Sequence, residues 1–219
     1  MKYGESIFDI VYLLFTVVTG IYMVKRTDES CRYMGIATLV LGCGDAFHLI
    51  PRVLDYFSDA DFTSALGIGK LITSITMTVF YVIMYRIWIM VYGESDNRTL
   101  GVIIYLLSAV RVILCMMPQN NWMKNDSPMA WGIIRNIPFL IIGTIIIWLY
   151  YKKRVYNQHL SFIWVYVLLS FLFYMPVATI VSYIPMLGIL MLPKTVCYML
   201  IVLSFFRYTT SNDVSLDRR

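Results

Sequence analysis

Seven continuous apolar segments, each long enough to cross a lipid bilayer, place the strongest limit on the folds open to this chain. A helix rises 1.5 Å per residue, so about 20 apolar residues span the hydrocarbon core of a membrane. In lipid every backbone polar group must be satisfied within the protein, and an α-helix achieves this within one segment. We therefore predict an all-α membrane protein with seven transmembrane helices, at residues 5–24, 33–54, 64–90, 99–117, 130–151, 160–183 and 185–207.

The overall composition agrees with a membrane protein. Hydrophobic residues make up 59% of the 219 residues and charged residues only 14%, whereas a soluble domain carries about 25% charged residues. We predict one transmembrane domain over residues 1–207 and a short cytoplasmic tail over 208–219, in a multi-pass protein of the cell membrane. The lipid bilayer is the expected partner. The net charge of +5 lies mostly in short loops and does not indicate nucleic acid, and the sequence leaves the oligomeric state open.

Basic residues collect on one side of the predicted bundle, which indicates its orientation. Lys2, Arg52 and Lys124 are the basic residues in loops or at span ends on one side. In membrane proteins the cytoplasmic loops carry the excess of Lys and Arg. We therefore predict that the N-terminus lies outside and the C-terminus lies in the cytoplasm, because the other side carries eleven basic residues: Lys25, Arg26, Arg32, Arg86, Arg98, Lys152, Lys153, Arg154, Arg207, Arg218 and Arg219.

The number of segments permits an internal duplication. Helices one to three and five to seven would have the same orientation, which allows a parallel 3+1+3 repeat. Leu-Gly-Ile-Gly-Lys at residues 66–70 opens the third segment, and Leu-Gly-Ile at residues 187–189 opens the seventh, with Lys194 soon after. This layout resembles that of the SWEET and PQ-loop transporters, and in outline that of the opsins. The resemblance rests on helix number and orientation, without a family motif, and implies two parallel three-helix halves.

Four basic residues lie inside the apolar segments: Lys70, Arg111, Arg135 and Lys194. An ionised side chain at the centre of a membrane costs about 2.5–3.5 kcal/mol even on the lenient insertion scale. On the predicted topology all four lie in or near the outer half of their segments, with Lys194 the deepest. We expect these side chains to face each other, water or a ligand, since lipid would not tolerate them.

Helical spacing places further polar groups beside these charges. Asp45, His48 and Arg52 are three and four residues apart and share one face of a helix. Thr73 and Ser74 follow Lys70 at similar spacing. The predicted ligand-binding residues are therefore Asp45, His48, Lys70, Thr73, Ser74, Arg111, Arg135 and Lys194.

The balance of charge among these groups favours an anionic ligand. The four embedded cations, with Arg52 at the rim, face two embedded carboxylates, Asp9 and Asp45. Ion pairs within the protein neutralise two of the five positive charges at most, so the others require an anion or a neutral lysine. Arginine and lysine suit carboxylates and phosphates, and arginine can bind them with two parallel hydrogen bonds.

We predict an integral membrane protein that binds a small anionic solute from the outer side. As a transporter, it would also carry this solute across the membrane. Two alternatives remain open at this point. One is a metal-free enzyme that acts on an anionic lipid or head group, with Asp45 and His48 as an acid–base pair. The other is a ligand-binding membrane sensor.

No metal and no cofactor are predicted. A metal site needs three or four ligands that meet at one point, and the two histidines, His48 and His159, fall on opposite sides of the membrane. Lys194 lies where an opsin holds its retinal, but the third segment contains no Asp or Glu to serve as the counter-ion. We also expect Trp122 to anchor the outer membrane interface, where tryptophan is enriched.

Overall fold

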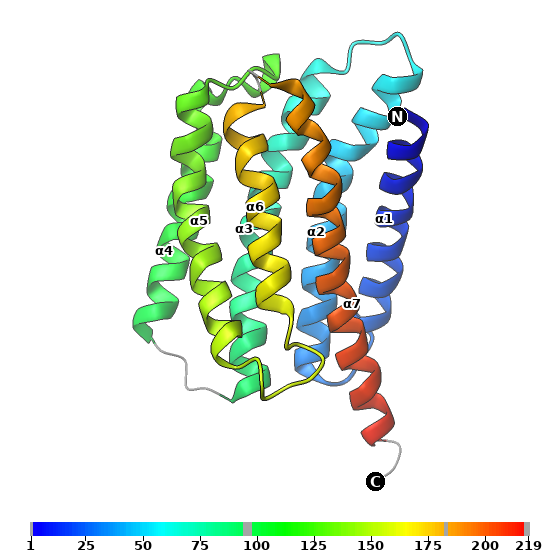
Figure 1. The fold of residues 1–219 in the computed structure, drawn as a ribbon, viewed down its shortest axis with the longest axis vertical. Helices are drawn as coiled ribbons and strands as arrows, with labels where there is room; N and C mark the ends of the chain where they lie inside the picture. Colours follow the sequence, from blue (N-terminus) through cyan, green and yellow to red (C-terminus); the bar gives the residue numbers. More distant parts are fainter. Residues whose placement is uncertain (1, 94–97, 182–183, 217–219) are drawn as a thin grey trace.

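The computed structural model describes residues 2–93, 98–181 and 184–216, and no strand occurs in these ranges. Seven long helices stand side by side, with the N-terminus at one end of the bundle and the C-terminus at the other (Figure 1). Short 3-10 helices lie in the connections: η1 (Pro118–Asn120), η2 (Trp122–Lys124) and η3 (Pro185–Leu190). The long helices are α1 (Lys2–Val24), α2 (Glu29–Phe57), α3 (Thr63–Tyr92), α4 (Arg98–Met116), α5 (Met129–Lys152), α6 (Ile163–Ile180) and α7 (Met191–Leu216).

Six stretches, in α1 to α5 and at Met186–Asn212, are long and apolar enough to cross a membrane. This architecture is compatible with a multi-pass membrane protein. The sixth predicted span, residues 160–183, corresponds to α6, whose apolar stretch Ile163–Thr179 is shorter than the other six. The last two residues of that predicted span, 182 and 183, lie outside the described residues.

The last helix differs from its predicted span at both ends. Residues 185–190 form η3, and α7 begins only at Met191. Pro193 therefore lies in the first turn of α7, where its missing N–H breaks no intrahelical bond, and not within a helix that it would weaken. At its other end α7 continues to Leu216, so residues 208–216 of the predicted tail extend the helix.

The matching Leu-Gly-Ile tripeptides of the predicted repeat occupy different structures. The first lies inside α3, where a Cβ on Gly67 would come within 1.6 Å of the Trp122 carbonyl oxygen. The second lies in η3, where a Cβ on Gly188 would meet no atom within 4 Å. The two glycines thus have different packing roles, and the 3+1+3 repeat stays a prediction.

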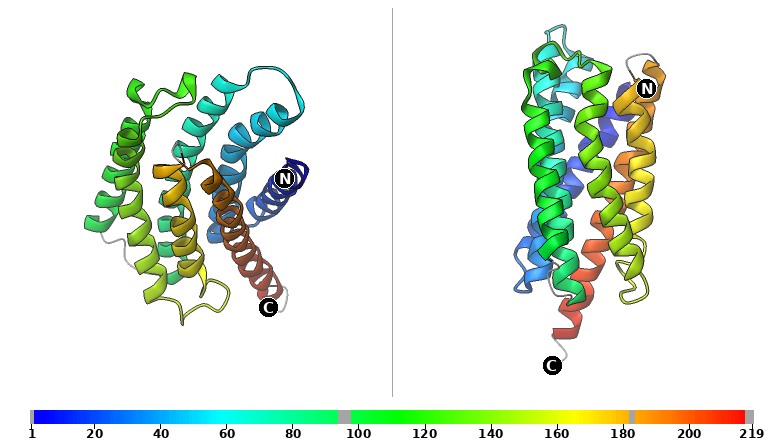
Figure 2. Two further views of the ribbon diagram at one scale, coloured as in Figure 1. Left: turned by 45° about the horizontal axis from the view of Figure 1, so that its top comes forward. Right: turned by 90° about the vertical axis from the view of Figure 1, so that its left-hand side faces the viewer.

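The helices pack around the bundle in chain order. Each helix contacts the next, α3 also touches α5, and α7 returns to contact α1 and α2 (Figure 2). The α2–α3 contact is very close because glycines face the neighbouring backbone and side chains: Gly69 lies against the carbonyl oxygen of Phe47, and Gly44 lies against Thr76. Small residues allow helices in membranes to approach in this way.

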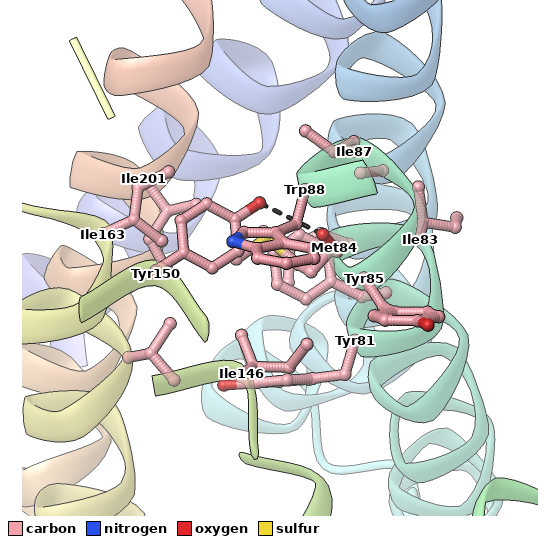
Figure 3. Packing of buried hydrophobic residues seen from close by; sticks show 14 of the residues in the cluster. Tyr81, Ile83, Met84, Tyr85, Ile87, Trp88, Ile146, Tyr150, Ile163 and Ile201 are labelled. Atoms are coloured by element: carbon pink, nitrogen blue, oxygen red, sulfur yellow. Dashed lines mark hydrogen bonds between the residues drawn. The ribbon is translucent and has the colours of Figure 1, made fainter. Parts of the chain in front are cut away.

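Buried aromatic and aliphatic side chains of α3, α5, α6 and α7 pack together in one core (Figure 3). Tyr81 and Trp88 of α3 and Tyr150 of α5 are buried there. The polar ends of two of them reach backbone oxygens: Tyr150 Oη donates to the Met84 carbonyl at 3.1 Å, and Trp88 Nε1 donates to the Leu149 carbonyl at 3.0 Å. A buried aromatic ring with its polar atom satisfied in this way is a stable core element.

The turn before α2 contains the N-cap Asp28, which yields a stability prediction. Its Oδ1 accepts a hydrogen bond from the Cys31 N–H at 2.9 Å and another from the Ser30 hydroxyl. Partial desolvation raises the pKa of the Asp28 carboxyl, but these hydrogen bonds outweigh it and lower the pKa below its ordinary 3.8. A carboxyl with a lowered pKa stabilises the fold above its ordinary pKa, and this contribution is lost as the pH falls through the folded value.

Asp28→Ala is therefore expected to cost about 1 kcal/mol of stability at neutral pH, the usual effect of removing an N-cap. Thermal unfolding in detergent measures it, and the difference from wild type should disappear in strongly acidic buffer. Thr27→Ala, at the exposed position before it, is the control and should leave the unfolding temperature unchanged. An equal loss in both variants would contradict the capping role.

Candidate functional site

A cavity of about 270 Å³ lies at the end of the bundle that carries η1 and η2. It reaches the surface beside the exposed residues Lys70, Asp126 and Met129, and it ends against Met77 and Phe139. Side chains from α2 to α7 and from the η1–η2 connection line it. Seven of the eight residues predicted to bind a ligand are in its wall: His48, Lys70, Thr73, Ser74, Arg111, Arg135 and Lys194.

Arg111 of α4 and Lys194 of α7 form what we call the deep pair. Arg111 is 1% exposed, its Cζ lies 3.3 Å from the centroid of the Phe139 ring, and its Nε and Nη1 have no hydrogen-bond partner among the described residues. Lys194 is 6% exposed, and its Nζ lies 4.9 Å from the centroid of the Tyr174 ring. Neither residue forms an ion pair with a described carboxylate. Both are thus buried cations that lie against the faces of aromatic rings.

Aromatic faces attract these cations but do not replace their water. A cation–π contact contributes about 0.5–2 kcal/mol, whereas the effective penalty for burying an unpaired ion is several kcal/mol. The Phe139 and Tyr174 rings are perpendicular, with centroids 6.0 Å apart, and Tyr174 Oη donates to Asn136 Oδ1 at 3.0 Å. Each cation therefore has one of these two packed rings beside it, and in the described residues no carboxylate lies within ion-pair distance of either cation.

Lys70 and Arg135 form the mouth pair, and both bind residues 117–128, which we call the cap segment. Lys70 Nζ donates to Asn125 Oδ1 at 2.7 Å. Arg135 Nη1 donates to Asn120 Oδ1 at 2.7 Å and to Ser127 Oγ at 2.8 Å. The cap segment is thus tied to both α3 and α5 by the two cations at the mouth.

Sequence reasoning did not foresee this role for the cap segment. The amide-rich run at residues 119–121, between two segments that each carry an embedded arginine, was the available signal. Trp122, which we expect to anchor the membrane interface, also lines the cavity. Its Nε1 donates to the Cys115 carbonyl at 2.8 Å, and the Arg135 guanidinium lies 4.5 Å from its ring centroid.

The two predicted hydroxyl residues use their protons on backbone oxygens. Thr73 Oγ1 donates to the Gly44 carbonyl at 3.0 Å, which ties α3 to α2. Ser74 Oγ donates to the Lys70 carbonyl at 2.7 Å, within α3. Their remaining capacity is to accept hydrogen bonds. Neither hydroxyl therefore has a proton left to donate to an anion in this cavity.

Asp45 is the predicted site residue that the structure leaves out of the cavity wall. Its Oδ2 accepts a hydrogen bond from the buried Tyr12 hydroxyl of α1 at 2.7 Å. His48, one turn later, lines the cavity, and its Nδ1 has no partner among the described residues. No hydrogen bond between Asp45 and His48 occurs in the described structure. Asp45 and His48 therefore have different surroundings although they lie on one face of α2. A buried hydroxyl needs a hydrogen-bond acceptor, and Asp45 is the acceptor for Tyr12.

Arg52 and Asp9 also lie away from the cavity. Arg52 Nη2 pairs with Glu5 Oε2 at 3.1 Å, and the Tyr56 hydroxyl donates to the same oxygen at 2.7 Å. Asp9 borders a separate, apolar pocket between α1 and α2. The charge count from the sequence omitted Glu5, which neutralises Arg52. Among the described residues that line the cavity there are four cations and one carboxylate, Asp126, so the positive excess there remains three.

In the described part of the chain, no group of three or more His, Cys, Asp and Glu side chains comes together to hold a metal ion. Comparison of the chain with protein-family models, with curated proteins and with solved structures finds no match.

Proposed function

We propose that this chain is a seven-span integral membrane protein that binds a small anion in the cavity, from the outer side of the membrane. The observation that carries the proposal is the deep pair: two buried cations line a cavity and have no ion-pair partner among the described residues. Such charges are expensive in a membrane protein unless they are paired. An anion in the cavity supplies the missing partner.

The position of the cavity supports access from outside. It lies at the same end of the bundle as the start of α1, whereas the turn between α1 and α2 lies at the opposite end (Figure 1). That turn carries Lys25 and Arg26, and Arg32 lies in the first turn of α2. The basic run at residues 152–154 ends α5 and follows it at the same end of the bundle. Since such residues mark the cytoplasmic side, the cavity would face outward, with the N-terminus.

Binding is the part of the proposal that the geometry supports best. Along α3, α5 and α7 the residues of the aromatic core follow those that line the cavity, toward the other end of the bundle. A transporter would have to open this core, whereas a sensor would use the cavity as it stands. An acid–base enzyme has less support, because Asp45 bonds to Tyr12 and does not line the cavity beside His48.

A thermal-shift experiment with the purified protein tests anion binding. Carboxylates, phosphate and sulfate would be titrated against wild type, Lys194→Met and Lys124→Met. A ligand at 100 times its Kd stabilises a protein by about 2.7 kcal/mol. We expect this shift in wild type and in Lys124→Met, whose exposed lysine does not line the cavity. Lys194→Met should show none.

Two results would contradict the proposal. One is a screen in which no anion shifts wild type at any concentration. The other is a shift of equal size in wild type and Lys194→Met, which would place the anion elsewhere. For an anion that binds, uptake into liposomes then separates a transporter from a sensor.

A further inference from the structure

The two pairs of cations in the cavity differ in the hydrogen bonds that they already form within the protein. The mouth pair donates short hydrogen bonds to three side chains of the cap segment: Asn120, Asn125 and Ser127. In the part of the chain that the structure describes, the deep pair has no such partners, and Arg111 keeps Nε and Nη1 without a hydrogen bond. The pairs therefore differ in the number of donors that they can offer to a ligand.

The bonds of the mouth pair belong to a wider attachment of the cap segment to α3. Ser64 Oγ donates to the Met123 carbonyl at 3.1 Å. Gly67 lies so close to the Trp122 carbonyl oxygen that a Cβ there would be 1.6 Å from it. Ser127, which accepts from Arg135, itself donates to the Asn120 carbonyl. The hydrogen bonds of Lys70 and Arg135 thus belong to a larger set of contacts that holds the cap segment against the helices, and some of these contacts lie outside the cavity.

The helices that carry the deep pair and their neighbours also contribute apolar side chains to the cavity. Met77, Phe139, Val177, Ala178 and Met191 are among the residues that line it. A second charge placed among these side chains would lose its water without gaining a partner, which is unfavourable. The volume of about 270 Å³ restricts the ligand to a small molecule.

From these observations we propose that the ligand is a small monoanion with an apolar body. Its charged group binds Arg111 and Lys194, and its body contacts the apolar wall. Lys70 and Arg135 hold the cap segment across the mouth and do not bind the charged group. This inference rests on the proposed function and adds the ligand class and the separate role of the mouth pair.

Hexanoate and adipate are a matched pair of probes, because they have the same carbon chain and adipate carries a second carboxylate. Isothermal titration of the purified protein is expected to give hexanoate a Kd at least about tenfold lower than that of adipate. Dodecanoate distinguishes a soluble ligand from a lipid-derived one. Its chain has twice as many carbons as hexanoate, so tighter binding than hexanoate would identify a lipid source of the same anionic group.

Variants separate the two pairs of cations. Arg111→Gln and Lys194→Met should each weaken hexanoate binding at least about a hundredfold, while Lys70→Gln and Arg135→Gln should change it less than about fivefold. Hydrogen exchange of residues 117–128 gives a second readout. It should increase in Lys70→Gln and Arg135→Gln and stay at the wild-type level in Lys194→Met.

Different outcomes overturn different statements. If adipate binds as tightly as hexanoate and loses affinity in Arg135→Gln, the mouth pair binds ligand and this inference is wrong. If phosphate or sulfate binds at the deep pair while hexanoate does not, the apolar body is wrong and the proposed anion site stands. If no anion binds and hydrogen exchange of the cap segment is unchanged in every variant, both the proposed function and the role of the mouth pair in holding the cap segment are wrong.

Discussion

Replacement of Arg111 by methionine is expected to abolish anion binding and, at the same time, to stabilise the ligand-free protein. Arg111 is 1% exposed, and its Nε and Nη1 form no hydrogen bond with the residues that the structure describes. Replacing buried ionic groups by apolar side chains of similar volume is often stabilising by about 1–4 kcal/mol. Methionine retains the flexible apolar stem and can still contact Phe139. We expect a gain of about 2 kcal/mol, measured as a higher thermal unfolding temperature without ligand.

Loss of anion binding together with a gain in stability would identify Arg111 as a ligand-binding residue. An arginine that supports the fold would lower the stability when it is replaced. Groups that serve a binding site are commonly kept at the expense of stability. Arg135→Met is the matched control, because its guanidinium donates to Asn120 and Ser127 and its removal leaves those acceptors unpaired. This control should unfold at a lower temperature than wild type. A lower unfolding temperature for Arg111→Met as well would mean that Arg111 supports the fold.

Gly69→Ala is expected to have the largest effect on the fold itself. A Cβ at this position would lie 2.2 Å from the Phe47 carbonyl oxygen and 2.8 Å from the Cα of His48. Both are backbone atoms of α2, so the clash is relieved only if α2 and α3 move apart. Overpacking of this kind costs about 1–3 kcal/mol and occasionally more, and we expect about 3 kcal/mol here because no side chain can rotate away.

Thermal unfolding and anion titration of the same samples would measure both consequences of Gly69→Ala. Movement of α2 would also displace His48 from Lys70 across the cavity, so binding should weaken together with stability. Gly4→Ala and Gly188→Ala are controls, since a Cβ at either position would meet nothing within 4 Å. Unfolding of Gly69→Ala at the wild-type temperature would show that the α2–α3 contact is not as close as described.

Much of the bundle could be predicted from the sequence because the membrane imposes simple rules. The long helices lie close to the predicted segments. In lipid, an apolar segment of this length must pair its backbone N–H and C=O groups within itself, and the α-helix does so. The same rules predicted that Lys70, Arg111, Arg135 and Lys194 would face inward, and all four line one cavity. The start of α7 at Met191, where residue 185 was predicted, follows from η3, whose i to i+3 turns the hydrophobic pattern does not distinguish from an α-helix.

What the sequence by itself determined is which residues can cross a membrane and which charged groups must avoid lipid, because both depend on composition and helical period alone. Tertiary structure decided which partner each polar group takes. Tyr12 reaches Asp45 across the α1–α2 contact, Glu5 neutralises Arg52, and the cap segment occupies the mouth pair but not the deep pair. These partners are distant in the chain, so only the packing of the helices brings them within the 3 Å or so that a hydrogen bond requires.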